Sequence, residues 1–280
     1  MNSIYFPSSG PEIKFCGLKF YSKNGRVAQW LIGRFVLFFY LLVTVKVAQA
    51  KTKQDSVYTP FKFSGTLILS TNGISPIPAF SLDKPAVLVN LSLRKRRFSF
   101  NPEMSFSTKG IPWYLNNFFR YRLIEKKRFQ FQTGLIWGIG YSYPKVIQNG
   151  ISRTIAKAER FLWLELVPKY KISEKVAISS TTFSGYNFEP GSVKRINYIS
   201  LIGNITKIKL HNFIYGSFFP QLFYLNIDNK SDGFFVAGVL GIGHNKLPLF
   251  LSAQVNQTLT TTITPDPGFK WNVSLSYSFK

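Results

Sequence analysis

The sequence is poor in the residues that most catalytic, metal-binding and disulfide-bonded proteins need. Of its 280 residues only 12 are Asp or Glu, two are His and one is Cys. The single cysteine, Cys16, excludes a disulfide framework and a cysteine-based zinc module. His211 and His244 are too few for most histidine-ligated metal sites. No Gly-x-Ser-x-Gly or His-x-x-Glu-His motif occurs, and we expect no cofactor.

Basic and aromatic residues are plentiful instead. The chain carries 35 Lys and Arg and a net charge of +23, and 17% of its residues are aromatic. That aromatic content is atypical of a disordered basic tail. A nucleic-acid-binding protein gathers its basic residues on one helix or face. Here they form short clusters spaced along the chain, with no zinc-finger, helix-turn-helix or RNP pattern, so we predict no nucleic-acid partner.

Residues 1–50 have the order of a secretory signal peptide. Arg34 precedes an apolar run over 35–45, and Ala48-Gln49-Ala50 supplies the small-x-small cleavage pattern. The run is shorter than the ~20 residues that a spanning helix needs. We predict cleavage after Ala50, with an uncleaved signal anchor as the alternative. The stretch 1–33 is long for the n-region of a signal peptide, which suits an over-extended translation start.

Beyond Ala50 the hydrophobic pattern has a period of two, as in 269–279, where every second residue is apolar. Such alternation predicts a strand with one apolar and one polar face. Twelve segments follow this pattern: 61–70, 86–94, 98–107, 113–123, 129–142, 160–171, 176–187, 195–207, 213–227, 233–243, 249–263 and 269–279. These strands are long for a soluble sheet and suit a tilted membrane crossing, which takes ~9–11 residues.

The predicted connections alternate in length. Every even-numbered link is tight, whereas 71–85 and 143–159 among the odd-numbered links are long and 108–112 is a short exception. Tight turns at one end and longer loops at the other are typical of outer-membrane barrels, which place the turns in the periplasm. An even strand number returns both termini to that side. Ten or fourteen strands are neighbouring possibilities.

Over residues 51–280 the sequence resembles Gram-negative outer-membrane β-barrel proteins. The residues that carry the resemblance form the closing strand, WNVSLSYSF, with Trp271, Tyr277 and the terminal aromatic Phe279. Lys280 after the Phe departs from the usual pattern. The resemblance implies an all-β, antiparallel transmembrane barrel of about 12 strands in the outer membrane, in contact with outer-membrane lipids and recognised by the barrel-assembly machinery. A secreted β-sandwich with the same alternation is the alternative fold.

In a barrel of this kind the polar face of each strand lines the lumen. The alternation places these residues inward: Lys62, Arg94, Glu103, Asn116, Arg120, Arg122, Glu165, Lys169 and Lys270. Glu103 and the Arg120/Arg122 pair lie on neighbouring strands and can form ion pairs. The cations outnumber the acids, which favours a pathway that attracts small anionic solutes. A salt-bridged plug that closes the barrel is an equally open interpretation.

Three functions fit these features. The first is a porin-like transport channel for small polar or anionic solutes, and the second is a non-enzymatic barrel with a closed lumen that anchors or scaffolds. The third is a lipid- or peptide-modifying barrel enzyme, which would need a His near one rim. Because both histidines map to tight turns, we predict that the chain is not an enzyme. Basic turns such as 94–97 and 126–128 suit anionic lipid headgroups, or are simply solvated.

Overall fold

The computed structural model describes residues 60–148 and 151–280. The predicted signal peptide, residues 1–50, lies outside the described residues. No helix in the described part of the chain is long and apolar enough to cross a membrane.

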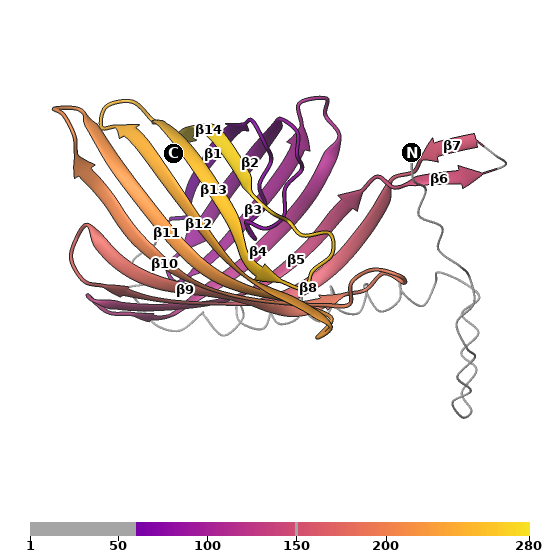
Figure 1. Cartoon of the computed structure of the whole chain (residues 1–280). Helices are drawn as coiled ribbons and strands as arrows, with labels where there is room; N and C mark the ends of the chain where they lie inside the picture. The colour runs from indigo at the N-terminus through magenta and orange to yellow at the C-terminus, as the bar shows by residue number, and fades with distance from the viewer. Residues whose placement is uncertain (1–59, 149–150) are drawn as a thin grey trace. The chain divides into compact units, whose positions relative to one another are not determined.

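Twelve antiparallel strands close into a single barrel, drawn from indigo to yellow in Figure 1. Sequential strands pair with one another, β5 pairs with β8, and β1 pairs with β14 to close the ring. A separate two-stranded sheet, β6 with β7, is inserted between β5 and β8. The strands are β1 (Lys62–Ser70), β2 (Ala86–Lys95), β3 (Phe98–Ser107), β4 (Pro112–Glu125), β5 (Phe129–Ser142), β6 (Lys145–Gln148), β7 (Ile151–Thr154), β8 (Lys157–Lys171), β9 (Val176–Asn187), β10 (Arg195–Lys209), β11 (Ile214–Ile227), β12 (Ser231–His244), β13 (Leu249–Thr261) and β14 (Lys270–Phe279).

The predicted barrel of twelve antiparallel strands is confirmed, and the alternative of a β-sandwich is wrong because the ladder closes on itself. The sequence did not predict β6 and β7, which lie in a segment expected to be a loop. Each of these strands has only four residues, too few for a period of two to stand out.

The two ends of the barrel differ. One end, here the turn side, carries the links 96–97, 126–128, 172–175, 210–213 and 245–248. The other end, the loop side, carries 71–85, 108–111, the β6–β7 hairpin, 188–194, 228–230 and 262–269. The predicted asymmetry in length is present, although 228–230 is a second short link on the loop side.

Large apolar side chains cover the outer face of the barrel. On β5 and β8, the side chains of Leu135, Trp137 and Leu164 are 45–48% exposed. The next residues along these strands, Ile136 and Glu165, are each only 2% exposed. Outer and inner positions therefore alternate along each strand, as the pleat requires. An apolar surface of this extent is unfavourable in water, and it matches the lipid-facing band of a transmembrane barrel.

The loop 71–85 folds inward and packs against a cluster of aromatic side chains. Ile77 and Ala79 are buried in this cluster. Backbone hydrogen bonds from Ser75 N to Phe80 O and from Gly73 N to Lys84 O, both 3.0 Å, hold the loop as a tight hairpin. We call the aromatic side chains that line the inside the interior aromatic cluster: Phe118, Phe161, Trp163, Phe183, Tyr198, Phe223 and Phe235.

From Phe161 to Phe235 the rings of the interior aromatic cluster follow one another around the wall from β8 to β12. Their centroids are separated by 4.4 Å (Phe161–Trp163), 6.2 Å (Trp163–Phe183), 5.4 Å (Phe183–Tyr198), 5.5 Å (Tyr198–Phe223) and 4.9 Å (Phe223–Phe235). These separations are close to the range in which aromatic pairs attract. One side of the lumen is thus filled by a packed apolar layer.

The closing strand β14 presents its aromatic residues on the outside. Trp271 and Tyr277 are about half exposed, and Phe279 lies 6.1 Å from the ring of Phe63 on β1. Gly65 lies beneath Phe279, and a Cβ at this position would collide with the Phe279 ring. Glycine at this position therefore leaves room for the ring of the last aromatic residue at the junction between β1 and β14, and a larger residue would displace that ring.

Candidate functional site in the barrel lumen

Two cavities open inside the lumen. The loop-side cavity has a volume of about 220 Å³ and is lined by residues of loop 71–85 and of β4, β5, β8 and β9. The turn-side cavity has a volume of about 750 Å³ and is lined mainly by β1 to β4, with contributions from the end of β14. Phe118 lines both cavities, so it stands at the boundary between them.

Strand β4 supplies the side chains along this boundary. Its alternation sends Tyr114, Asn116, Phe118, Arg120 and Arg122 inward, in order from the loop side to the turn side. Tyr114 and Asn116 line the loop-side cavity and Arg120 lines the turn-side cavity. A single strand therefore carries aromatic, amide and cationic groups past the narrow part of the lumen.

Arg120 forms a bidentate ion pair with Glu165 on β8. Its Nε lies 2.6 Å from Oε2 of Glu165, and its Nη2 lies 2.7 Å from Oε1. Glu165 is 2% exposed, and the guanidinium of Arg120 also lies 4.1 Å from the centroid of the Phe118 ring. A buried, bidentate pair of this kind fixes both side chains. The charge of Arg120 is consequently neutralised at the boundary.

The pair reaches across β5 because Gly134 stands between its partners. The register places Gly134 opposite Arg120 on one side and opposite Glu165 on the other. A Cβ on Gly134 would lie 2.9 Å from the carbonyl oxygen of Phe119, 3.0 Å from Cγ of Arg120 and 3.2 Å from Oε2 of Glu165. A larger residue would fill the space through which the two charged groups meet.

The sequence suggested Glu103 as the partner of Arg120 or Arg122, and the structure differs. Ser99, not Glu103, stands opposite Arg120 on β3, while Gly134 opens the path to Glu165 on the other side. Glu103 faces Asn90 and Asn116 on its two neighbouring strands, and its Oε1 atom is buried without a hydrogen-bond partner.

The remaining predicted basic residues lie toward the two ends of the barrel. Arg122 and Arg94 both contact Oε1 of Glu125 near the turn side, at 2.5 and 3.7 Å. Lys62 and Lys169 also lie toward the turn side, opposite Arg94 and Gln130. The ion pairs of the described residues do not include these two lysines.

Lys270 lies at the other end of the barrel. Its Nζ is 2.9 Å from Oδ1 of Asp83 in loop 71–85. This ion pair fastens the base of the inward loop to β14.

The sequence did not predict a group of buried oxygen atoms on β2 to β4. We call it the β2–β4 oxygen cluster: Asn90 Oδ1, Glu103 Oε1, Ser105 Oγ, Tyr114 Oη and Asn116 Oδ1. Each of these atoms is buried, and the Tyr114 hydroxyl lies next to the Glu103 carboxylate and the Ser105 hydroxyl. Glu103 and Asn116 were expected to face inward, but the local alternation does not show that their oxygens meet those of Asn90, Ser105 and Tyr114.

The interior aromatic cluster was missed as well, since apolar residues were expected to face lipid. One signal was available in Phe161–Leu166, where apolar residues occupy both alternating positions except at Glu165. A run of this kind indicates a strand that is buried on both faces.

Both histidines lie at the turn side, His211 in the link 210–213 and His244 as the last residue of β12. His211 is exposed in the link 210–213, and Nδ1 of His244 accepts hydrogen bonds from the backbone N–H groups of Lys246 and Leu247, at 3.2 and 3.0 Å. Within residues 60–148 and 151–280, no three His, Cys, Asp or Glu side chains are grouped so that they could hold a metal ion.

Comparison with known proteins identifies the fold. The chain matches no family model and no curated protein sequence. Among solved structures it is similar to the KdgM porin in complex with disordered oligogalacturonate, with a TM-score of 0.50 and 10% identity over 78% of this chain and 99% of that chain.

Other similar structures are an outer membrane channel from Pseudomonas putida F1 and the NanC porin. The first has a TM-score of 0.46 and 10% identity, over 81% of this chain and 99% of that chain. The NanC porin has a TM-score of 0.45 and 10% identity, over 77% of this chain and 99% of that chain. The closed barrel and its likeness to the KdgM porin show that the chain has the fold of outer-membrane β-barrel proteins, as its closing strand suggested.

Proposed function

We propose that this barrel is a narrow outer-membrane channel for small polar solutes, closed at rest by loop 71–85. The observation that carries the proposal is the presence of two cavities inside one lumen, which meet at Phe118. A solute that crosses the barrel would occupy each cavity in turn. The apolar outer face suits a lipid environment, and the signal-peptide pattern of residues 1–50 suits export.

Loop 71–85 is the element that closes the passage. To open it, Ile77 and Ala79 must leave the interior aromatic cluster. Burial of one Ile side chain contributes about 1.5–3 kcal/mol, and the loop is also held by the ion pair of Lys270 with Asp83. We therefore expect the closed state to predominate, with opening as a rare event.

The charge at the turn side supports a preference for anions, although a weaker one than the sequence suggests. Lys62 and Lys169 raise the local positive potential there. Glu165 neutralises Arg120, whereas Arg94 and Arg122 share the single carboxylate of Glu125, so two of these three positive charges are offset. We expect the double change R120Q/R122Q to free Glu165, to leave Glu125 with Arg94 alone, and to shift the reversal potential toward cation permeation, whereas an unchanged potential would contradict an ionic role for this region.

Orientation and assembly follow the same model. The turn side would face the periplasm, so that the basic link 126–128 meets lipid headgroups of the inner leaflet. Phe279 would be the residue that the barrel-assembly machinery recognises, since it is the last residue of β14.

A barrel with a permanently closed lumen, acting as an anchor or scaffold, is the second candidate. The interior aromatic cluster favours it, because packed apolar side chains of this size stabilise a wall rather than an aqueous pore.

Planar-bilayer recordings separate the two candidates. We expect rare openings in the wild type and a marked increase in I77S, because Ser at this position weakens the attachment of the loop to the interior aromatic cluster. The matched control is I147S on β6, where the side chain is 81% exposed. If folded I77S barrels conduct no more than the wild type, the channel proposal fails and the scaffold stands.

A further inference from the structure

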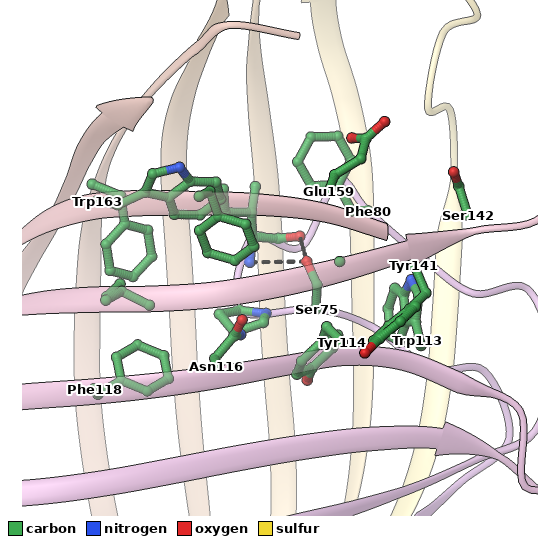
Figure 2. Close-up of a pocket in the computed structure, with 16 residues that line it drawn as sticks. Ser75, Phe80, Trp113, Tyr114, Asn116, Phe118, Tyr141, Ser142, Glu159 and Trp163 are labelled. Carbon is green, nitrogen blue, oxygen red and sulfur yellow. Dashed lines mark hydrogen bonds between the residues drawn. The ribbon is translucent and has the colours of Figure 1, made fainter. Parts of the chain in front are cut away.

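The two ends of the barrel differ in charge as well as in the length of their links. Links 96–97 and 126–128 on the turn side consist entirely of Lys and Arg. The loop-side cavity, drawn in Figure 2, is lined by rings such as Phe80, Trp113 and Trp163. None of its lining residues, all of which lie in the described part of the chain, is Lys or Arg. A ligand with negative charge therefore finds its partners at the turn side.

The links 126–128 and 172–175, together with the end of β8, border a cavity of about 440 Å³, which we call the rim pocket. The two links are neighbours because β5 pairs with β8 along the wall (Figure 1). One water molecule takes up about 30 Å³ of the liquid, so the rim pocket has room for a group several times larger. Its lining residues are Lys127, Arg128, Lys171, Ile172, Ser173 and Glu174.

The backbone holds two of the cations of the rim pocket side by side. The N–H of Lys171 donates to the carbonyl oxygen of Arg128 at 2.7 Å, which extends the β5–β8 ladder one step beyond the pair Phe129 and Tyr170. Residues that stand opposite each other in an antiparallel ladder project to the same face. A further hydrogen bond, from Lys126 N to Phe129 O at 2.8 Å, closes the link 126–128 as a tight turn. The side chains of Arg128 and Lys171 thus start from adjacent, fixed points.

The rim pocket carries a net positive charge. Lys127, Arg128 and Lys171 line it against a single acid, Glu174, so three positive charges and one negative charge leave a net charge of +2. The ion pairs of the described residues include none of these four side chains. Like charges gathered in one pocket repel one another, and an anion that enters relieves this repulsion. A ligand with two negative charges would balance the site.

The rim pocket also supplies hydrogen-bond donors that suit phosphate oxygens. The Oγ atom of Ser173 accepts hydrogen bonds from the backbone N–H groups of Lys175 and Val176, at 3.3 and 3.1 Å. Neither bond uses the O–H of Ser173, which can donate to a ligand. The planar guanidinium of Arg128 can donate two parallel hydrogen bonds to one phosphate group, and the lysine ammonium groups add compact positive charges.

We propose that the rim pocket binds a phosphate monoester. The phosphate group of such a compound carries nearly two negative charges at neutral pH, which matches the net charge of the lining residues. Arg128 holds two of its oxygens, Lys127 and Lys171 flank it, and Ser173 donates to it. The inference goes beyond the channel function, because it does not require that the lumen conduct. It also gives the basic link 126–128 one specific ligand in place of a general attraction to the membrane.

Two sources carry a phosphate monoester. Lys171 follows Glu165 and Lys169 on the inward face of β8, so a phosphorylated solute can reach it from the turn-side opening of the lumen. Tyr170 and Ile172 are 49% and 54% exposed, and the chains of a phosphorylated lipid can pack against them. Glycerol 3-phosphate and phosphatidic acid carry the same phosphate group without and with lipid chains, so they separate the two sources.

The soluble source is tested by isothermal titration calorimetry on the folded full chain in a zwitterionic detergent at low ionic strength. The probes are glycerol 3-phosphate, glycerate, which has a singly charged carboxylate instead of the phosphate, and glycerol, which has no charge. We expect glycerol 3-phosphate to bind about fivefold more tightly than glycerate, and glycerol not to bind.

The lipid source is tested by native mass spectrometry of the chain from phosphatidylcholine nanodiscs that contain phosphatidic acid and diacylglycerol. Binding of glycerol 3-phosphate identifies a soluble source, whereas selective retention of phosphatidic acid alone identifies a lipid source. If glycerate binds as tightly as glycerol 3-phosphate, or if neither phosphate compound binds, the proposal is overturned.

Variants locate the site. R128Q and K171Q each remove one positive charge, and we expect each to weaken phosphate binding about fivefold. E174Q removes the acid and should strengthen binding, a result that misfolding cannot produce. The matched control is K209Q/K230Q, which removes two exposed positive charges outside the rim pocket and should leave binding unaltered.

A general attraction to a basic barrel gives a different pattern. If K209Q/K230Q weakens binding as much as R128Q/K171Q does, or if E174Q weakens it, the rim pocket is refuted as the site. Neither assay measures current, so failure of the channel proposal in bilayer recordings leaves the phosphate site standing, and failure of the phosphate site leaves the channel proposal standing.

Discussion

The ion pair between Arg120 and Glu165 allows a sharp prediction about stability. Arg120→Gln leaves Glu165, which is 2% exposed, buried without its cation. Breaking a buried pair by removing one partner typically costs about 3–5 kcal/mol, because an uncompensated charge remains. Since Gln can still donate one hydrogen bond to the carboxylate, we expect a loss near the lower end of that range.

A second ion pair on the same strand provides the control. Arg122 and Glu125 are 30% and 38% exposed, and an exposed pair contributes about 0–1 kcal/mol. Arg122→Gln should therefore cost far less than Arg120→Gln. The double replacement R120L/E165L removes both buried charges together and is expected to be close to neutral, because the desolvation cost disappears with the attraction.

The measurement is equilibrium unfolding in lipid vesicles with increasing urea, followed by tryptophan fluorescence. Comparison of R120L and E165L, each made alone, with R120L/E165L gives the coupling energy of the pair. If R120Q and R122Q destabilise the barrel equally, or if R120L/E165L costs as much as the sum of its single changes, the ion pair is not the buried, mutually compensating unit that the geometry shows.

Three further predictions concern Gly134 in the barrel wall, Phe279 at the junction of β1 with β14, and Glu189 in the loop 188–194. Gly134→Val should lower the free energy of unfolding by about 1–3 kcal/mol through overpacking, and Gly140→Val, where a Cβ meets only a carbonyl oxygen at 4.0 Å, should cost less in the same assay. Phe279→Ala should reduce the amount of barrel assembled in isolated outer membranes, and undiminished assembly would remove this residue from the recognition signal. The hydrogen bond from Arg160 lowers the pKa of Glu189 in the loop 188–194. The resulting stabilisation is present above the unfolded pKa of about 4.3 and is lost as the pH falls through the lower, folded value. Proteolysis of this loop should accelerate over that acidic range, and R160Q should remove the pH dependence.

The strands could be predicted because their two faces meet different environments. In β3, β5 and β9 the alternation of apolar and polar residues gives the observed bounds, since lipid on one side and the lumen on the other impose a period of two. The same reasoning predicted that Arg120 and Glu165 face inward. This inference needs only the sequence of each strand and no knowledge of which strands pair with it.

The contacts inside the lumen could not be predicted, because they depend on strand order and on space. Arg120 meets Glu165, which is 45 residues away, only because β5 pairs with β8 and Gly134 leaves room between them. The inward fold of loop 71–85 depends on the interior aromatic cluster, whose members come from six strands. Alternation alone does not distinguish an inward Phe223 from an apolar residue that faces lipid.

The junction between β1 and β14 has a consequence for the order in which the barrel forms. Its ladder is among the shortest of the ring, joining Gly65–Ser70 to Ser274–Phe279, whereas β11 and β12 pair over their whole length. Its two strands are also the farthest apart in sequence, so their loop-closure entropy is the greatest. The nascent sheet must therefore pass through a stage with two free edges, which are prone to pair with other chains. Because Phe279 covers Gly65 at this junction, we expect the final step of folding to be the docking of one ring onto one glycine.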